Sequence, residues 1–594
     1  MRSRLARIMW DHGALLGILT LVLYIWIAPE HIVDGDNAEF STLGTLGGTG
    51  HPSGYPAYVL WLRAWSWLPG ASPAHTAAIA TAILSALQMV VLIAACRAWG
   101  IRAAAANVAV MILAGAPVIL AIYTEAEVFA MNGLVAATVL WLAGAAGPLR
   151  GRWRCAVLGL IAGIGMANHL TCTLLAPVGL LGVVRGVRES SASTRTRPLA
   201  AGFAIGGLVV GLTPYLYLLV APEHWGTWGK PETLGDVLHV FLRNDYGGPG
   251  TFAAGAAEPY PLENLVALGH TLARTWLYVP ALMGLGALGY QIARPGPVES
   301  RWGWALLLAS LLLAGPLLVM RFNVLPGDGL STYVIERFHL LVMVIFVIPV
   351  AAGFQVVGEL VARRLSGRAL GSRGVGMALV TCGFAAIVST SLPHVLVVHA
   401  PAVELLVRNM LRSLPHDAVV IGASDDFHSG TPYVQLVLGE RRDVVYVNWP
   451  MMRSAWYRAR RARAGVVLEM NKPGVASIRL AESVLASGRP LFVDMMQGNI
   501  LESFPSYPHG ILYRVLPRGA QPPPIEEVFA LNKQLYERFE ITYPRPGLDD
   551  QWATMVHVKY AWPWRRLAAA LRKAGRLEDA AWALEAAREI GPQQ

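Results

Sequence analysis

Long apolar runs separated by short polar segments fill the first two thirds of the chain. A helix needs about 20 mostly apolar residues to cross a bilayer, so these runs predict about 11 transmembrane helices. The runs are 12–28, 74–97, 102–122, 126–146, 154–168, 170–185, 199–220, 273–293, 303–320, 336–357 and 375–396. Two of them, 154–168 and 170–185, are short, which indicates a tight hairpin broken at Asn168 and His169. The pattern is typical of a polytopic α-helical membrane protein.

The segment 57–68, "AYVLWLRAWSWL", is apolar but too short to span a bilayer. Its aromatic residues suit a helix that lies in the membrane interface, and the two prolines at 52 and 56 would fix the entry to that helix. The residues that we expect to anchor it are Tyr58, Trp61, Trp65 and Trp67.

The pattern changes after residue 400. Short β-branched runs at 417–423, 443–449 and 489–495 alternate with helical stretches, which is typical of a small α/β domain with a partly parallel sheet. We therefore divide the chain into a membrane domain (1–398), an α/β domain (399–545) and a C-terminal helical hairpin (546–594).

The hairpin is predicted from the tail at 563–591. Its apolar positions have the spacing of a single tetratricopeptide unit, and one such unit cannot bury its own apolar face. We expect it to pack on the α/β domain or on a partner. The positions are Trp564, Leu567, Ala568, Leu571, Ala580, Leu584 and Pro592.

The charge of the chain follows the same organisation. Only 14% of the 594 residues are charged and 55% are hydrophobic, whereas soluble domains carry about 25% charged residues. The net charge of +10 would suit nucleic acid, but the arginines fall in alternate loops, which predicts cytoplasmic loops and excludes that partner. These arginines are Arg2, Arg4, Arg7, Arg97, Arg102, Arg150, Arg152, Arg154, Arg185, Arg188, Arg195, Arg197, Arg294, Arg301, Arg363, Arg364, Arg368 and Arg373.

The arginine pattern also predicts which segments share a side. No small-residue cleavage site follows the run 12–28, so we expect it to be retained, with the N-terminus in the cytoplasm. An odd number of spans then places the loops 29–73, 221–272 and 321–335 and the whole C-terminal part outside. Nearly all of the chemically interesting residues belong to this set. The four cysteines lie in or beside apolar runs and show no disulfide or zinc spacing.

Three carboxylates, Asp34, Asp36 and Glu39, lie within six residues beside the first span. Carboxylates at a membrane boundary are costly unless they are solvated or used. Asp36 could cap a helix that starts near Asn37, with Glu39 completing a near capping box. That structural interpretation does not account for the continuation into "GTGHPSGYP", whose glycines allow close backbone approach. The residues alone leave both interpretations open.

Here the chain shows a specific resemblance. "DNAEF…LGGTGHPSGYPAY" resembles the first outer loop of the bacterial membrane family related to the eukaryotic protein O-mannosyltransferases, which are GT-C glycosyltransferases with lipid-phosphate sugar donors. Phe129, Lys230 and His339 depart from the tyrosine, aspartate and tyrosine of that family. The further segments that resemble it, in order, are "EAEVFAMN" (125–132), "GMANHLT" (165–171), "TWGKPETLGDVLHVFLRNDYG" (227–247), "ERFHL" (336–340) and "LPHDAVVIGASDD" (414–426).

The resemblance implies an inverting glycosyltransferase of the bacterial inner (cytoplasmic) membrane. It would move a sugar, mannose or another hexose, from a polyprenyl-phosphate donor to a hydroxyl acceptor, a protein Ser or Thr, on the outer face. The motif match maps the catalytic base onto Asp36 and a second acid onto Glu39, which would orient the acceptor or bind a metal. Asp34 lies outside the shared pattern, yet its nearness leaves the assignment among the three acids open. The implied partners are the lipid-linked donor, an exported protein and membrane lipids.

Sugar transfer also needs cations or hydrogen-bond donors for the leaving phosphate. Arg337, at the outer end of a span, could bind phosphate with both arms of its guanidinium, or it could form a structural pair with Glu336. His51 could donate to phosphate or sugar, or hold its turn. His169, with Asn168 at an outward helix break, could serve the site or the fold.

Further candidates lie on other outer segments, and the weaker ones are Arg243 and Lys230. Glu127 matches a family position and could line the sugar pocket or neutralise Arg337, while Glu125 flanks the same turn. As plain charges near a helix N-terminus, both would also be stabilising. Arg243 lies in the long outer loop.

A secondary site is suggested by "GASDDFHSG" (422–430), which follows the first predicted strand of the α/β domain. Open α/β sheets bind ligands at that end of their strands. Asp425, Asp426 and His428 are its candidates. The alternative, which the residues favour, is a solvated loop with a helix cap.

No Walker sequence and no glycine-rich nucleotide fingerprint is present, which argues against a nucleotide-sugar donor. Asp34, Asp36 and Glu39 could hold a hard divalent cation. The O-mannosyltransferases that the chain resembles are regarded as metal-independent, so we expect neither metal nor cofactor. The alternative function is a transporter or flippase of a lipid-linked or polar solute. The lack of an internal repeat and the clustering of the acids on one side argue against it.

Overall fold

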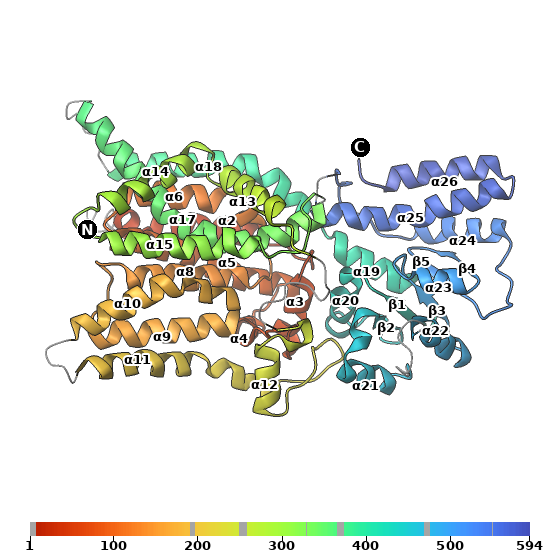
Figure 1. Cartoon of the computed structure of the whole chain (residues 1–594). Coiled ribbons are helices and arrows are strands. Elements are labelled where there is room, and N and C mark those ends of the chain that lie inside the picture. Colours follow the sequence, from red (N-terminus) through yellow and green to blue (C-terminus); the bar gives the residue numbers. More distant parts are fainter. Residues whose placement is uncertain are drawn as a thin grey trace.

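The computed structural model describes residues 8–190, 196–248, 258–327, 329–364, 373–467, 476–548 and 551–593. Arg2, Arg4, Arg7, Arg195 and Arg368, which contributed to the predicted sidedness, lie outside the described residues. A bundle of long helices forms one part of the molecule, and a mixed α/β part joins one end of it (Figure 1). The short helices α3, α4 and α12 lie at the joint between the two parts.

Every predicted apolar run contains a helix. Within the described residues, six helices are long and apolar enough to cross a membrane, and four shorter apolar helices accompany them. The exact number of spans stays a prediction. The elements of this part are α2 (Ala14–Ile27), α3 (Asn37–Leu46), α4 (Pro56–Trp65), α5 (Pro73–Ala98), α6 (Ala103–Gly115), α7 (Pro117–Ile122), α8 (Phe129–Ala143), α9 (Gly151–Asn168), η1 (Leu170–Leu175), α10 (Ala176–Glu189), α11 (Thr196–Gly211), η2 (Thr213–Leu219), α12 (Leu234–Phe241), η3 (Asn244–Tyr246), α13 (Pro261–Thr275), α14 (Val279–Ala293), α15 (Arg301–Ala314), α16 (Pro316–Val319), α17 (Gly329–Arg364) and α18 (Arg373–Val398).

Two element boundaries differ from the apolar pattern. The run 102–122 is split into α6 and α7 because Pro117 lacks an N–H and starts a new helix. The helix in the run 273–293 starts later than predicted, because Leu277 and Tyr278 adopt positive φ values of 52° and 58°. These two residues separate α13 from α14. Half of the expected long outer loop is therefore structured, with α12 and α13 in it.

The segment predicted to lie in the membrane interface forms helix α4. The prediction that Tyr58 anchors this helix in the interface is wrong. That side chain is fully buried, and its hydroxyl lies 2.6 Å from Thr81 Oγ1 on α5. Trp61 also turns inward and donates to the carbonyl of Ala80, at 2.9 Å. Trp67, just after the helix, is 73% exposed. The aromatic composition of the segment could not tell the face packed on α5 from the outer face.

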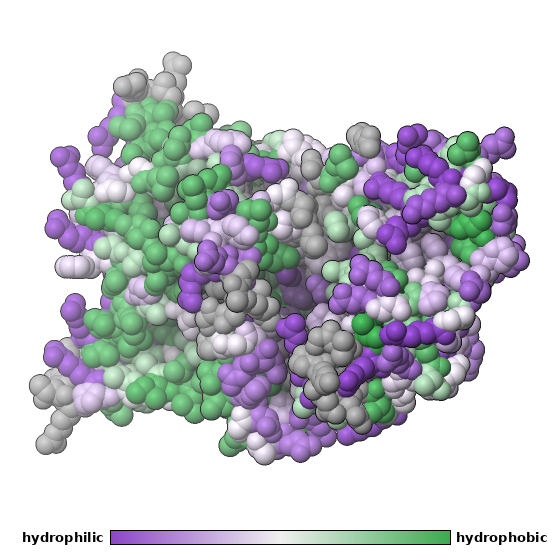
Figure 2. Space-filling model, turned by 45° about the vertical axis from the view of Figure 1, so that its right-hand side comes forward, coloured by the Kyte–Doolittle hydropathy of each residue, from purple (hydrophilic) through white to green (hydrophobic). Residues whose placement is uncertain are grey.

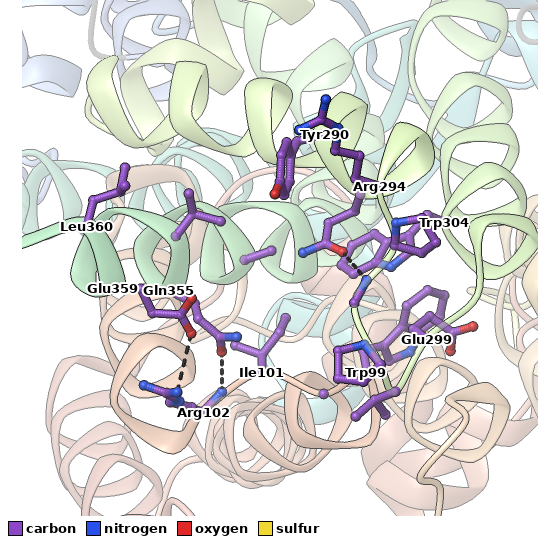
Figure 3. Close-up of a pocket in the computed structure, with 18 of the residues that line it drawn as sticks. Trp99, Ile101, Arg102, Tyr290, Arg294, Glu299, Trp304, Gln355, Glu359 and Leu360 are labelled. Atoms are coloured by element: carbon purple, nitrogen blue, oxygen red, sulfur yellow. Dashed lines mark hydrogen bonds and ion pairs between the residues drawn. The ribbon is translucent and has the colours of Figure 1, made fainter. Parts of the chain in front are cut away.

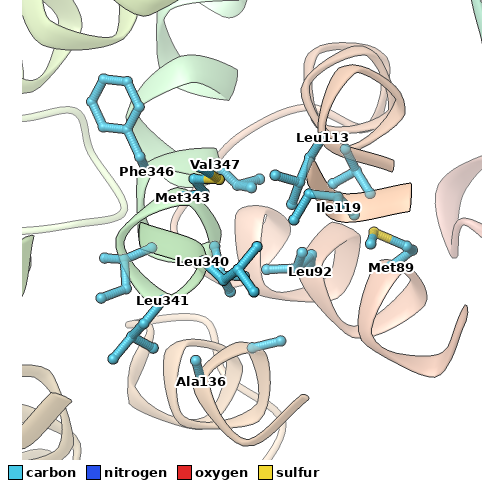
Figure 4. Close-up of a cluster of buried hydrophobic side chains, with 14 of the residues drawn as sticks. Met89, Leu92, Leu113, Ile119, Ala136, Leu340, Leu341, Met343, Phe346 and Val347 are labelled. Carbon is cyan, nitrogen blue, oxygen red and sulfur yellow. The ribbon is translucent and has the colours of Figure 1, made fainter. Parts of the chain in front are cut away.

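Shape-matched apolar packing holds the helical part together. Side chains of α5, α6, α7, α8 and α17 interdigitate around Leu92, Leu113, Leu340 and Met343, all of them buried (Figure 4). Helix α17 is the central element, since 78% of its most apolar window is buried. The exposed apolar side chains gather over the helical part and the polar ones over the C-terminal part (Figure 2). This division supports a bilayer around the helices alone.

The C-terminal part contains the expected α/β fold and one feature that the sequence pattern missed. Strands β1, β2 and β3 pair in parallel as predicted, and an antiparallel hairpin of β4 and β5 extends the sheet to the order β2-β1-β3-β5-β4. The elements are α19 (Ala402–Ser413), β1 (Val419–Gly422), α20 (Asp425–Pro432), η4 (Tyr433–Val437), β2 (Val445–Asn448), η5 (Pro450–Arg453), α21 (Ala455–Arg463), α22 (Ala476–Ala486), β3 (Leu491–Val493), α23 (Gly498–Ser503), β4 (Ser506–His509), β5 (Leu512–Val515), α24 (Ile525–Glu537), α25 (Gln551–Lys573) and α26 (Leu577–Ile590).

The tail is a helical hairpin of α25 and α26. Trp564, Leu567, Leu571 and Ala580 are buried in it, together with Phe529 of α24. Helix α25 starts 12 residues before the predicted segment and also packs on α17 and α18. The hairpin therefore buries its apolar face on both parts of the molecule. A match to the tetratricopeptide unit stays a prediction.

Helices α9 and α11 approach closely through glycines. Gly159 and Gly163 of α9 face Gly207 and Gly211 of α11, and a Cβ added to any of the four would collide with a backbone carbonyl of the other helix. Small residues spaced by four are a known contact of membrane helices, because they let the backbones meet.

We predict that Gly163→Leu separates α9 from α11 and lowers the melting temperature of the purified protein by several degrees. Overpacking of this kind costs about 1–3 kcal/mol. The matched control is Gly206→Leu on α11, where an added Cβ meets open space. Thermal unfolding in detergent measures both, and equal melting of the two variants would contradict the glycine contact.

Candidate functional site

The predicted site residues come together where the helical part meets the α/β part. The contributing elements are the loop before α3 with α3 itself, the turn between α7 and α8, the end of α17 nearest the α/β part, and α20. Helix α20 packs directly on α3, as their adjacent positions in Figure 1 indicate. The basic loops lie elsewhere. Glu299 pairs with Arg185 and Glu359 pairs with Arg102, so these loops contact one another away from the site.

An ion triad forms the centre of the site. One nitrogen of the Arg337 guanidinium donates to Asp36 Oδ2, at 3.0 Å, and to Glu127 Oε1, at 3.1 Å. Glu127 also accepts from the backbone N–H of Asp36, at 3.2 Å. Glu127 is fully buried, whereas the Asp36 side chain is 34% exposed. The triad therefore presents Asp36 as its open member.

Three segments far apart in the sequence supply this triad. Arg337 projects from α17, where Tyr333 lies one turn earlier on the same face, 5.0 Å from the guanidinium carbon. Phe129, at the start of α8, covers the guanidinium from another side, at 6.0 Å. The family match at 125–132 and at 336–340 thus corresponds to residues in contact.

The capping-box interpretation of Asp36 and Glu39 is wrong. The Asp36 side chain makes no cap hydrogen bond to α3. Glu39 instead reaches the "GHPSGYP" turn, where Oε1 accepts the backbone N–H of His51, at 2.7 Å, and Oε2 lies 2.8 Å from His51 Nδ1. His51 Nε2 lies 2.8 Å from the hydroxyl of Tyr55. The spacing that suggested a cap therefore clamps the turn.

The charges around Asp36 set its protonation. Burial alone would raise the pKa of Asp36, but the charges of His51 and Arg337 outweigh burial and hold this pKa below its ordinary value. Burial alone would lower the pKa of His51, but the carboxylates of Glu39 and Asp36 reverse this effect and raise it. Asp36 is thus an open, ionised carboxylate beside two cationic groups.

Asp34 belongs to a separate, buried carboxyl pair. Its side chain hydrogen-bonds to Glu125, and the hydroxyl of Tyr333 donates to Glu125 Oε1, at 3.2 Å. Burial raises the pKa of Asp34 to about 7 and the pKa of Glu125 well above its ordinary value. Two carboxyls so close in an apolar setting hold at least one proton between them at neutral pH. Both acids therefore act on the fold of the loop.

A cavity of about 300 Å³ opens beside the triad. Its polar lining comes from His169, Tyr55, Arg243 and Arg321, and its apolar lining includes Phe338. The ring of His169 stacks on Tyr55, at 5.9 Å and 22°, and its Nδ1 lies 2.7 Å from Thr171 Oγ1. Burial lowers the pKa of His169 to about 3, so the imidazole is neutral.

The cavity continues into an apolar groove. The groove has a volume of about 450 Å³ between α8, α9, α10 and α11, and it shares Met166 and Thr173 with the first cavity. Leu158, Leu180 and Leu208 are among its lining residues. A cavity that carries cationic side chains thus adjoins an apolar groove.

Asn168 and Arg243 have identifiable structural contacts here. The Asn168 amide donates to the carbonyl of Val128, at 3.1 Å, and ties the helix break to the turn that carries Glu127. Arg243 adopts a left-handed backbone conformation with φ 57°, which directs it to the cavity, and its buried Nε has no hydrogen-bond partner. A bound acceptor would satisfy that nitrogen.

Two predicted candidates lie away from the site chemistry. Glu336 does not pair with Arg337 but accepts from Thr271 on α13, at 3.3 Å. Asp426 is buried in an ion pair with Lys559 and accepts from the indole of Trp552, at 2.7 Å. Asp426 therefore joins α20 to α25, and the expected solvated loop is wrong for it.

Asp425 and His428 lie on the side of α20 that borders the site. Asp425 is exposed at the start of the helix. The ring of His428 lies 6.0 Å from that of Trp228, which lies 6.0 Å from the ring of His51 on its other side. Trp228 therefore connects the α/β part to the clamped turn.

Metal ligands are available in part. Among the described residues, Asp36, Glu39 and His51 offer ligand atoms within 4.8 Å of one another. Asp34 is not among them, because it faces Glu125. The three acids Asp34, Asp36 and Glu39 therefore do not surround one common cation position. Both nitrogens of His51 already have protein partners.

Three contributors were missed from the sequence: Tyr55, Tyr333 and Trp228. Tyr55 lies inside the "GYP" turn quoted above. Tyr333 precedes Arg337 by four residues, and this spacing places Tyr333 and Arg337 on one face of the helix. These two signals could have been found. Nothing in the sequence around Trp228 predicts its position between His51 and His428.

The chain is similar to known proteins over part of its length. Residues 36–191 match the family model of the "Protein O-mannosyl-transferase TMEM260 N-terminal domain". The protein O-mannosyl-transferase TMEM260 of Mus musculus is 24% identical over 475 residues, which cover 76% of this chain and 65% of the mouse protein. The chain thus spans a little under two thirds of that relative.

Solved structures give the fold. The apo structure of ArnT from Cupriavidus metallidurans aligns with a TM-score of 0.51 and 13% identity over 85% of this chain and 97% of ArnT. The archaeal oligosaccharyltransferase AglB from Archaeoglobus fulgidus, 11% identical over 98% of this chain and 84% of AglB, aligns at only 0.44. The family match includes Asp36, Glu39, His51 and Glu127, the residues of the triad and the clamp that precede α9. Residues 36–191 are thus similar to an O-mannosyltransferase domain, and the chain has a fold similar to that of ArnT.

Proposed function

We propose that the chain is an inverting glycosyltransferase. It moves a sugar, mannose or another hexose, from a polyprenyl-phosphate donor to a hydroxyl group of an acceptor, a Ser or Thr of an exported protein. The observation that carries this proposal is the open carboxylate of Asp36, held by Arg337 beside a cationic cavity that leads into an apolar groove. A sugar phosphate on a prenyl chain matches these three features in order: the sugar at the carboxylate, the phosphate in the cationic cavity and the prenyl chain in the apolar groove.

Asp36 acts as the general base. The acceptor oxygen attacks the anomeric carbon while the bond from that carbon to the phosphate oxygen breaks, and the hydroxyl proton passes to Asp36. The low pKa of Asp36 keeps it ionised at neutral pH. The hydroxyl becomes acidic only as the new bond forms, so the carboxylate takes the proton late in the step. Glu39, through His51, holds the turn that faces the acceptor.

Arg337 and Glu127 position Asp36. The guanidinium already donates to both carboxylates, so its main task is to fix the direction of the base and to keep it charged. Glu127 in turn holds the Asp36 backbone. This role replaces phosphate binding as the first task of Arg337.

The leaving phosphate is bound in the cavity by Arg243 and Arg321. Arginine suits phosphate because its planar fork of donors matches the oxygens. His169, which is neutral, adds a ring nitrogen to the same wall. The prenyl chain lies in the groove between α8 and α11, and its entry from the membrane is consistent with the 28% burial of the most apolar window at Leu170–Glu189.

The acceptor approaches from the α/β part. Helix α20 packs on α3, and Trp228 connects His51 with His428 of that helix. Asp425 is exposed at the same edge and can accept a hydrogen bond from a peptide. We assign residues 1–398 to the membrane domain, 399–545 to the α/β domain and 546–594 to the hairpin, with the C-terminal part outside a bacterial cytoplasmic membrane and no metal in the reaction.

We predict that Asp36→Asn lowers transfer at least 100-fold and leaves donor binding within threefold, because the variant removes a base worth about 10²–10⁴ in rate. Transfer of labelled mannose from polyprenyl phosphate to a Ser/Thr-rich peptide measures the first, and retention of the labelled donor measures the second. Glu232→Gln, at an exposed site of the long loop, is the control. A transporter would glycosylate no acceptor with either protein, and an Asp36→Asn variant with more than a tenth of wild-type transfer would exclude this base.

We predict that Asp34→Asn keeps at least a third of the transfer activity and raises the melting temperature at pH 8.5 by several degrees, with a clearly smaller rise at pH 5. The pKa of Asp34 rises from 3.8 in the unfolded chain to about 7 in the fold. Its stability contribution is thus fully present only below pH 3.8 and is lost progressively as the pH rises to 7, above which the buried charge costs about 4 kcal/mol. Thermal unfolding at both pH values tests the shift. Loss of transfer equal to that of Asp36→Asn would instead make Asp34 the base.

We predict that Arg243→Ala raises the KM for the donor about tenfold to a hundredfold and leaves the KM for the acceptor peptide unchanged. A hydrogen bond to a charged group contributes about 1.5–3 kcal/mol. Arg243→Lys should recover part of the loss. Lys230→Ala, an exposed cation of the same loop that does not line the cavity, is the control. Equal changes in both KM values would show a general distortion in place of phosphate binding.

A further inference from the structure

A second polar cavity lies at the opposite end of the helical part, among the arginine-bearing loops. It has a volume of about 570 Å³. Gln355, Glu359 and Leu360 of α17 form one wall, Tyr290 and Arg294 at the end of α14 form another, and Trp99 and Trp304 lie between them (Figure 3). None of these residues takes part in the site described above.

The charges of this cavity are unbalanced in favour of cations. Its two carboxylates are already neutralised, since Glu299 pairs with Arg185 and Glu359 lies 3.4 Å from Arg102. Arg294 and Arg363 also line the cavity, and among the described residues no carboxylate is paired with either. The start of α6, next to Arg102, adds the positive end of a helix dipole. The cavity therefore suits an anion.

An apolar path connects the cavity to the lipid-facing surface. Tyr290 is 50% exposed and Leu360 is 54% exposed at its rim. A second apolar groove of about 420 Å³ lies further along the same two helices and is lined by Leu285 of α14 and Phe346 of α17, among others. Phe346 and Gln355 are nine residues apart, which is about 14 Å along a helix. The polar cavity and the apolar groove are thus lined by successive parts of the same two helices.

We propose that this cavity binds the phosphate headgroup of an anionic phospholipid, whose acyl chains lie along α14 and α17 in the apolar groove. Arg294 and Arg363 bind the phosphate, and the amide of Gln291 lies beside it on the same wall. Basic pockets between transmembrane helices on the arginine-rich side recognise anionic lipid headgroups in this way. A soluble phosphate would use the arginines but leave the exposed apolar rim without a partner, so the lipid is the better fit.

The experiment compares the full chain in nanodiscs of phosphatidylcholine with and without phosphatidylglycerol. We expect phosphatidylglycerol to raise the melting temperature and to remain bound in native mass spectrometry. Arg294→Ala/Arg363→Ala should weaken its apparent affinity at least tenfold, and Arg294→Lys/Arg363→Lys should recover most of it. The control is Arg97→Ala/Arg301→Ala, which removes two exposed cations from the same end that do not line the cavity.

Three results would overturn the proposal. The first is an alanine variant that binds phosphatidylglycerol as the wild type does. The second is a control variant that loses affinity to the same extent, which would make the effect one of net charge. The third is an equal shift of the wild type by millimolar inorganic phosphate in phosphatidylcholine nanodiscs, which would identify a soluble anion. None of these outcomes depends on glycosyl transfer, so the proposal stands or falls apart from the function proposed above.

Discussion

The site depends on one guanidinium that is held between two carboxylates at the edge of an apolar bundle. Removing one partner from a buried ion pair leaves an unpaired charge and costs several kcal/mol. Arg337, Asp36 and Glu127 therefore cannot be separated without exposing a charge to the apolar interior. Since the three side chains come from α17, from the start of α3 and from the turn before α8, this interaction fixes the positions of all three segments.

Helix α17 links the site to the opposite end of the helical part. Arg337 near its outer end and Gln355 in the opposite cavity are 18 residues apart, or about 27 Å along the helix. Packing on α5, α6, α8 and α14 surrounds it, and burial of this extent leaves little freedom to tilt. The polar groups at its two ends are therefore set by one rigid element, while the bundle between them is held mainly by van der Waals packing.

The sequence predicted the helices and most of the site because both rest on strong local signals. Apolar runs of about 20 residues have few alternatives in a bilayer, and the motifs around Asp36, Glu127 and Arg337 resembled one known family. The choice of partner for each side chain could not be predicted, because it depends on tertiary contacts. The Asp36–Glu39 spacing fits a capping box, yet the tertiary partners Arg337 and His51 prevail over the cap.

Other differences between the sequence-based predictions and the structure also arise from tertiary contacts. Glu336 is adjacent to Arg337 in sequence, but successive residues on a helix point about 100° apart, so one faces α13 and the other the site. The β4–β5 hairpin was missed because "SYPHGILYRV" contains a proline and a histidine where a regular strand pattern has none. Composition also predicted an aromatic-rich helix at α4, but it could not show that Tyr58 faces α5.

The C-terminal hairpin is connected to the site through a continuous set of contacts. Tyr333 donates to Glu125 and packs edge-on against Trp552 of α25, at 5.7 Å, and Trp552 donates to Asp426 of α20. Lys559 neutralises Asp426 from the next turns of α25. The same helix therefore contacts α17, which carries Arg337, and α20, which borders the site. Because the buried charge of Asp426 is stable only with Lys559 beside it, the hairpin holds the two walls of the site together and is more than an appended module.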